Sequence, residues 1–114
     1  MRVLSFYKPK VPASGLPTPE HMMKMGAFAD EMTRKGHLVA AGGFLSGDGL
    51  HASLIDGKFQ AHGIIDPGDG FEGFGLLQAS TKEEMIGLVR RFLEVAGDGE
   101  CVIRPCMDGP PQPK

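Results

Sequence analysis

Two amphipathic helical segments, each with only one apolar stripe, are the feature that most constrains the fold of this chain. The first is predicted to begin at residues 18–20 (TPE), which combine an N-cap threonine, a proline at the first helical position and an acid in the first turn. The second is predicted to follow residues 80–83 (STKE), which have the spacing of a capping box, and to end before Gly97. The two stripes are Met22, Met25, Ala29 and Met32, and then Met85, Leu88, Val89, Phe92 and Ala96. Because one stripe buries one side of a helix, both helices are predicted to pack on the same face of a sheet.

Strand-like segments surround both helices. They occupy residues 2–7, 37–45, 50–55, 58–65, 71–79 and 100–107. Gly42 and Gly43 interrupt the second segment and predict a bulge or a close backbone approach, and Asp56-Gly57 is a strong signal for a two-residue hairpin turn. The order of the segments predicts an α+β fold, a ferredoxin-like βαββαβ sandwich with an extra β-hairpin. Residues 1–108 are predicted to form a single domain, and residues 109–114 a flexible Pro-rich tail.

One face of the predicted sheet has no cover. Both helices occupy the opposite face, yet apolar residues such as Leu4, Phe74 and Leu76 are expected on the face that the helices do not reach. A contiguous apolar surface open to water is typical of an interaction site. A two-fold homodimer with its sheets face to face is the simplest way to cover it, so we expect a dimeric α/β barrel.

Composition and charge exclude several classes of partner. Twelve Lys+Arg and 14 Asp+Glu give a formal net charge of −2, so the chain has no basic field of the kind that binds nucleic acid. No apolar run approaches the ~20 residues of a membrane span, and the N-terminus lacks a signal-peptide core, so a cytoplasmic location is expected. Cys101 and Cys106 are five residues apart in one predicted strand, which places them on opposite faces and disfavours a disulfide between them. The sequence has no zinc-binding or phosphate-binding motif, and we expect no metal and no cofactor.

The histidines of the predicted hairpin are the strongest candidates for chemistry. Counting outward from the turn pairs His51 with His62, with Cβ atoms about 4.5–5.5 Å apart. Because a histidine beside a carboxylate is typical of acid–base catalysis near neutral pH, His62 and Asp66 are the candidate catalytic residues, and His51 is a candidate for substrate binding. Two alternatives stay open. One is a transition-metal site completed by Asp66 or Glu72, and the other, which we favour over the metal, is a solvent-exposed polar pair without a function.

Arg104 and Tyr7 are the other candidate substrate-binding residues. Arg104 lies among apolar neighbours in the last predicted strand, where an arginine needs a carboxylate, a carbonyl array or an anionic ligand. Pairing with Glu100 or with a partner chain is favoured over ligand binding. Tyr7 ends the first predicted strand, and its hydroxyl is predicted to point either into the same cleft or to water.

The chain resembles the YCII-related, or DGPF-type, family of dimeric α/β-barrel proteins over most of residues 2–108. The similar stretches, in order, are residues 35–39 (KGHLV) leading to Gly42 and Leu45, residues 56–58 (DGK), residues 73–74 (GF) leading to Leu76, the helix at 80–91, and residues 104–108 (RPCMD). Two family features are absent. Residues 62–65 read HGII where the family has Asp-Gly-Pro-Phe, and Met25 stands where one branch of the family has the histidine of a proposed His–Asp dyad.

The resemblance implies a dimeric small-molecule-binding protein and leaves two functions open. The first is an enzyme, because related barrels host lyase, isomerase and oxygenase chemistries. Its acid or base would be His62, and Arg104 or His51 would orient a small organic acid or aromatic substrate. The second is a non-catalytic ligand-binding or regulatory accessory module, which the two missing features favour. Convergence of the two histidines with Asp66 and Arg104 on one pocket would favour the enzyme, and scattered positions the module.

Overall fold

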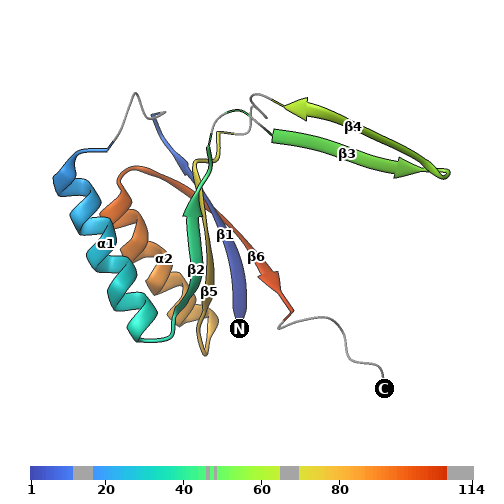
Figure 1. Cartoon of the computed structure of the whole chain (residues 1–114). Helices are drawn as coiled ribbons and strands as arrows, with labels where there is room; N and C mark the ends of the chain where they lie inside the picture. The colour runs from blue at the N-terminus through green and yellow to red at the C-terminus, as the bar shows by residue number, and fades with distance from the viewer. Residues whose placement is uncertain (12–16, 46, 48, 65–69, 108–114) are drawn as a thin grey trace, which may run out of the picture.

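The structure, a computed structural model of the whole chain, describes residues 1–11, 17–45, 47, 49–64 and 70–107. Within these residues it is an α+β protein with two helices and antiparallel sheets (Figure 1). The elements, in chain order, are β1 (Arg2–Pro9), α1 (Pro19–Arg34), β2 (Leu38–Gly43), β3 (Gly49–Ile55), β4 (Lys58–Ile64), β5 (Gly73–Gln78), α2 (Lys82–Ala96) and β6 (Gly99–Cys106). Every predicted strand and helix is present, with ends that differ by one or two residues. Residues 109–114, predicted to form the tail, lie outside the described part of the chain.

Both ends of α1 are capped as the sequence predicts. The Thr18 hydroxyl accepts a hydrogen bond from the backbone N–H of His21 at 3.1 Å, and a proline occupies the first turn. At the other end, the N–H of Lys35 donates to the carbonyl of Glu31 at 3.0 Å. Gly36 follows with a φ of 77°, a left-handed conformation that glycine adopts without steric cost. The chain can therefore leave the helix sharply and enter β2.

The N-terminus of α2 is capped one residue later than predicted. Thr81 is the N-cap, because its hydroxyl accepts a hydrogen bond from the N–H of Glu84 at 3.1 Å. The Glu84 carboxylate in turn accepts a hydrogen bond from the N–H of Ser80 at 3.0 Å. Residues 80–84 (STKEE) contain two overlapping hydroxyl–acid pairs with capping-box spacing, and the fold uses the second pair.

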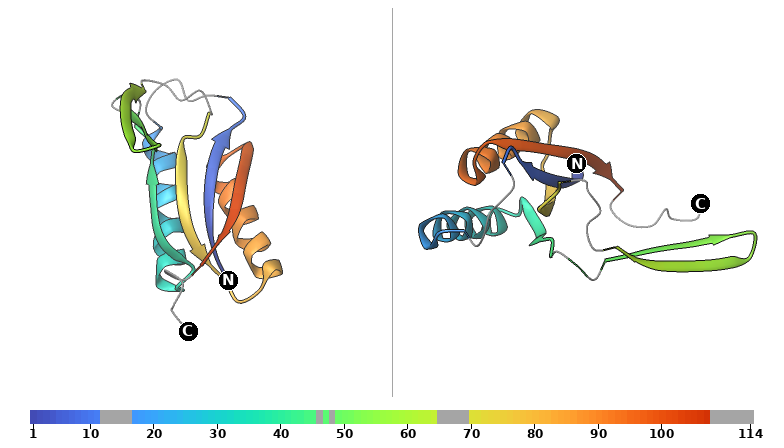
Figure 2. Two further views of the ribbon diagram at one scale, coloured as in Figure 1. Left: turned by 90° about the vertical axis from the view of Figure 1, so that its right-hand side faces the viewer. Right: turned by 90° about the horizontal axis from the view of Figure 1, so that it is seen from above.

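The four strands β2, β5, β1 and β6 form one antiparallel sheet in that order, and β3 and β4 form a separate two-stranded sheet. The first strand of the chain is therefore central, with the last two strands on either side of it. Both helices cover the same face of the four-stranded sheet, as Figures 1 and 2 show, and they contact each other. This confirms the prediction made from their single apolar stripes.

Alternation along β1 separates the two faces of the four-stranded sheet. Val3 and Ser5 are buried beneath the helices, whereas Leu4 and Phe6 point to the other side, which we call the open face. The buried apolar core is Val3, Met32, Ala79, Met85 and Leu88. Leu77 and Ile103 pack against this core, so the residues that alternate with them in β5 and β6 belong to the open face. Leu38 of β2 also packs against the core, but the register shifts after it, and the following Ala40 and Gly42 pair with Leu76 and Phe74 of the open face. Within the described residues, no helix covers that face.

The close approach predicted at Gly42 and Gly43 is present, because the Phe74 ring of β5 lies against the backbone of Gly42. The bulge predicted as the alternative does not occur at these two glycines. The register between β2 and β5 shifts earlier, between Leu38 and Ala40. At Gly42, a Cβ atom would lie only 2.9 Å from the ring of Phe74 on the neighbouring strand. A side chain at this position would therefore require the Phe74 ring to move.

The register of the β3–β4 hairpin is the predicted one. Asp56 and Gly57 form the turn with φ values of 52° and 77°, and two positive φ values are typical of a type I′ turn. Ile55 then pairs with Lys58, and counting back along the strands pairs His51 with His62. A local turn signal was therefore sufficient to place residues that are far from the turn itself.

The two cysteines lie on opposite faces of β6, as their spacing predicts. Cys101 is partly buried and Cys106 is exposed, and both are free thiols. Burial raises the pKa of the Cys101 thiol. Among the helices of the described residues, none combines the length and the apolar character that crossing a membrane requires.

Candidate functional site

The open face carries a group of phenylalanines at the end of the sheet from which the hairpin emerges. Phe6 lies in β1 and Phe74 in β5, while Phe44 follows β2 and Phe71 precedes β5. The ring centroids are 5.6 Å apart for Phe6 and Phe71, 5.6 Å for Phe44 and Phe74, and 6.5 Å for Phe6 and Phe44. These separations are favourable for aromatic contacts. We call these four residues the aromatic cluster.

Charged side chains border the aromatic cluster. The Lys8 ammonium lies 4.9 Å from the centre of the Phe71 ring, a cation–π geometry. It also lies 3.9 Å from the carboxylate of Glu100, which is directly opposite Lys8 in the β1–β6 ladder. Glu100 therefore pairs with Lys8 and not with Arg104, the partner considered from the sequence. Arg104 is exposed on the same face, opposite Leu4.

The two candidate histidines face each other on the hairpin. The ring centroids of His51 and His62 are 4.8 Å apart, and both side chains are exposed. The hairpin extends away from the four-stranded sheet (Figure 1), so the histidines are not on the open face that carries Arg104. Asp66, predicted to act with His62, lies outside the described residues.

Tyr7 and Arg104 lie on opposite faces of the sheet. Tyr7 pairs with Cys101 in the ladder, so Arg104, three residues further along β6, points the other way. The Tyr7 ring packs edge-to-face on Phe92 of α2 with centroids 5.3 Å apart, and its hydroxyl donates a hydrogen bond to the carbonyl of Gly97 at 3.4 Å. Burial is the main cause of the raised pKa of Tyr7. Tyr7 therefore does not share a cleft with Arg104 within one protomer.

The candidate third metal ligand, Glu72, is held by the four-stranded sheet. Its N–H donates to the carbonyl of Tyr7 at 2.8 Å, and its carbonyl accepts from the N–H of Phe44 at 3.0 Å. These bonds attach Glu72 to β1 and to the end of β2, whereas the histidine pair is on the hairpin. No group of three metal-ligating side chains occurs within the part of the chain that the structure describes.

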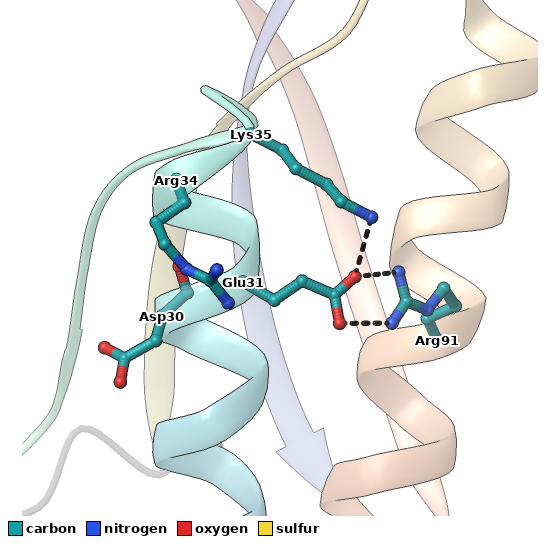
Figure 3. A network of polar contacts seen from close by, with 5 residues as sticks. All are labelled: Asp30, Glu31, Arg34, Lys35 and Arg91. Atoms are coloured by element: carbon teal, nitrogen blue, oxygen red, sulfur yellow. Dashed lines mark hydrogen bonds and ion pairs between the residues drawn. The ribbon is translucent and has the colours of Figure 1, made fainter.

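A polar network that the sequence did not predict joins the two helices. The Glu31 carboxylate in α1 accepts two hydrogen bonds from the Arg91 guanidinium of α2, at 2.8 and 3.1 Å, and one from Lys35 at 3.0 Å (Figure 3). The hydrogen bonds from Arg91, followed by the one from Lys35, lower the pKa of Glu31 to about 2. The spacing of Glu31 and Lys35 is visible in the sequence, but the contact with Arg91 depends on how the helices pack.

Replacing Glu31 by Gln is expected to lower the melting temperature at neutral pH and to have little effect near pH 2. Because the folded-state pKa is about 2 and the ordinary value is 4.5, the carboxylate stabilises the folded state above pH 4.5. That stabilisation is lost as the pH falls toward 2. Circular dichroism melts across this pH range measure the effect. The control is Asp30→Asn, which removes a carboxylate that points away from Arg91 and Lys35 (Figure 3). An equal Glu31→Gln effect at both ends of the range would contradict the prediction.

Two grooves in the described part of the chain do not bring the predicted site residues together. One groove of about 620 Å³ lies between α1 and α2 and includes Phe28, Glu31 and Arg91. Another, of about 880 Å³, lies where α2 meets the ends of β1 and β6. Neither contains the histidine pair, Tyr7 or Arg104.

The aromatic cluster with its charged border is therefore the candidate site. Sequence reasoning did not identify it, because its four rings come from segments that only the strand order brings together. Alternation along β1 assigns Phe6 to one face of the sheet, but it does not show which other aromatic rings lie on that face. A scan against protein-family models and a search of curated proteins find no match to this chain.

Proposed function

We propose that this chain is a homodimeric small-molecule-binding protein similar to the YCII-related family, with a ferredoxin-like βαββαβ sandwich and an extra hairpin. The ligand binds at the aromatic cluster, between the open faces of two copies. The observation that carries the proposal is the open face, an apolar surface centred on Leu4, Phe74 and Leu76 and opposite both helices. A surface of this kind is typical of an interaction site.

The strand order supports the ferredoxin-like assignment. In that sandwich, the first strand pairs with the third and the fourth, and the second strand lies at the edge beside the third. When the hairpin is set aside, the four successive strands here are β1, β2, β5 and β6, and their order is compatible with this arrangement. The hairpin is then an insertion between the second and third strands. Two helices on one face leave the other face for a second copy.

The chemistry of the open face supports a ligand that combines a planar apolar part with an anionic group. Aromatic rings offer an apolar contact surface, and cationic side chains at its edge recognise a carboxylate. Lys8 contacts the cluster at Phe71, and Arg104 lies on the same face, opposite Leu4 and two residues along β6 from Val102, which pairs with Phe6. Unlike Lys8, the Arg104 guanidinium has no ion pair or hydrogen bond within the described residues. It is therefore the side chain that is available to an anionic ligand.

The positions of the candidate residues support binding more than catalysis. The two histidines are on the hairpin, Arg104 is on the open face and Tyr7 is beneath the helices. General acid–base catalysis requires the proton donor and the orienting group to reach one substrate. We therefore propose a non-catalytic ligand-binding or regulatory role in place of acid–base catalysis by His62.

Replacing Arg104 by Gln is expected to weaken the binding of 1-naphthoate at least about tenfold, because a hydrogen bond to a charged group contributes about 1.5–3 kcal/mol. Isothermal titration calorimetry measures the dissociation constant. The uncharged probe 1-naphthalenemethanol should bind both proteins equally. The matched control is Arg90→Gln on the solvent side of α2, whose guanidinium pairs with Glu94. The proposal fails if the wild-type protein shows no saturable naphthoate binding, or if Arg104→Gln binds as tightly as Arg90→Gln.

A further inference from the structure

The β3–β4 hairpin has one apolar and one polar face. Because side chains alternate along each strand, the pairing places a set of apolar residues on one side, namely Leu50, Ala52, Leu54, Phe59 and Ala61. We call these five residues the arm face. The other side carries His51, Ser53, Ile55, Lys58, Gln60 and His62. The large side chains of the arm face are mostly open to solvent, with exposed fractions of 68% for Leu50, 68% for Leu54 and 69% for Phe59.

The hairpin stands apart from the rest of the chain. It projects from one end of the four-stranded sheet, on the side opposite the helices (Figures 1 and 2). None of the other described helices and strands packs extensively on β3 or β4. The radius of gyration of 16.6 Å accordingly exceeds the value of about 13 Å expected for a compact domain of this size.

A hairpin with one apolar face exposed to water is expected to have low stability and to associate with other surfaces. Two-stranded hairpins are only marginally stable unless a third strand or another surface covers them. An uncovered apolar strand face also favours non-specific association. The arm face therefore requires a surface that the described part of its own chain does not provide.

We propose that the arm face of each chain packs against a second copy of this chain, so that two hairpins act as reciprocal arms of a homodimer. The inference rests on the dimer proposed above and specifies a second contact within it. This orientation leaves the opposite face of the hairpin, with its two histidines, in water.

The arm is continuous with the proposed dimer interface. From β2 the chain passes through Phe44, a member of the aromatic cluster on the open face, and then enters β3. A strand of seven residues reaches about 23 Å at about 3.3 Å per residue. This is roughly twice the ~10 Å that separates packed sheets. An arm on the open side therefore extends beyond the sheet of a second copy and lies beside its body.

The area that two arm faces can bury is comparable to the area that a stable dimer interface needs. Large apolar side chains bury on the order of 150 Å² each, so three side chains that are about two-thirds exposed offer roughly 300 Å² per arm. A two-fold axis buries both arms together, and with the area covered on the partner surfaces the total is roughly 1,200 Å². This total area is at the lower end of the range for specific protein–protein interfaces. Contact between the two sheet faces would add further buried area. A second copy thus accounts for both uncovered surfaces at once.

The test compares two double variants of the hairpin in the full-length protein. Leu54→Ser with Phe59→Ser removes two of the three large apolar side chains of the arm face, and it is expected to raise the dimer dissociation constant at least about tenfold. The control, Ser53→Ala with Gln60→Ala, changes the directly paired residues on the opposite face and should stay within about twofold. Both variants keep Asp56 and Gly57 in the turn. Sedimentation velocity over a concentration series measures the dissociation constants.

A second measurement covers the case in which the arm variant simply unfolds the hairpin. A photoreactive phenylalanine analogue in place of Phe59 is expected to crosslink one chain to another, in an otherwise unchanged protein. The proposal is supported when the arm variant weakens the dimer and the crosslinks join two chains. A wild-type dimer that the arm variant leaves intact, or crosslinks only within one chain, overturns the arm contact and leaves the sheet-face dimer standing. A wild-type protein that is monomeric at every concentration overturns the proposed dimer itself.

Discussion

Replacing Met32 by Ala is expected to lower the free energy of unfolding by about 2–5 kcal/mol, the range for truncating a buried methionine. Met32 is only 2% exposed and lies in the core with Val3, Met85 and Leu88. The substitution removes apolar contacts and leaves a cavity between α1 and the sheet. Since domains are typically stable by only about 5–15 kcal/mol, the loss is a large share of the total. Urea denaturation followed by circular dichroism measures it.

The matched control for this experiment is Met22→Ala. Met22 belongs to the same helix and was assigned to the same apolar stripe, but it is 58% exposed. The same change of side chain there should alter the free energy of unfolding by less than about 0.5 kcal/mol. Comparable losses for the two variants would mean that Met32 does not have the buried position on which this core depends.

The helices, the strand segments and the hairpin register could be predicted because each depends on residues that are close in sequence. The Asp56-Gly57 turn shows this most clearly, since its two positive φ values fix the register as far away as the pair of His51 and His62. The N-cap of α2 was misplaced by one residue because Ser80 and Thr81 both have an acid at the right distance. Tertiary context, which a local pattern does not contain, selects between two such signals.

The candidate site could not be predicted because it depends on which strands become neighbours. Tyr7 ends the first predicted strand and Arg104 lies within the last, and it is the β1–β6 register that places them on opposite faces. The contact between Glu31 and Arg91 likewise joins residues 60 positions apart and requires both helices to be in place. Alternation along β3 groups Leu50, Ala52 and Leu54 on one side of the strand, but a local pattern does not show whether another part of the described chain covers that side.

Replacing Leu76 by Lys is expected to raise the dissociation constant of the proposed homodimer at least about 100-fold. Leu76 lies near the centre of the open face, between Leu4 of β1 and Ala40 of β2. In a face-to-face dimer its ammonium group would leave water without a paired carboxylate, which costs several kcal/mol. A 100-fold change corresponds to about 2.8 kcal/mol, so the expected effect is within that cost. Sedimentation velocity measures the dissociation constant, and circular dichroism shows whether the fold is retained.

Ile86→Lys is the matched control, because it places the same charge on the exposed surface of α2, where Ile86 is 59% exposed. It should leave the dissociation constant within about twofold of the wild type. The difference between the two variants then measures the burial of position 76 and not a general effect of charge on association. If both variants dimerise like the wild type, Leu76 does not lie in the interface. The two copies would then have to meet elsewhere, and the open face would not be the site where they enclose a ligand.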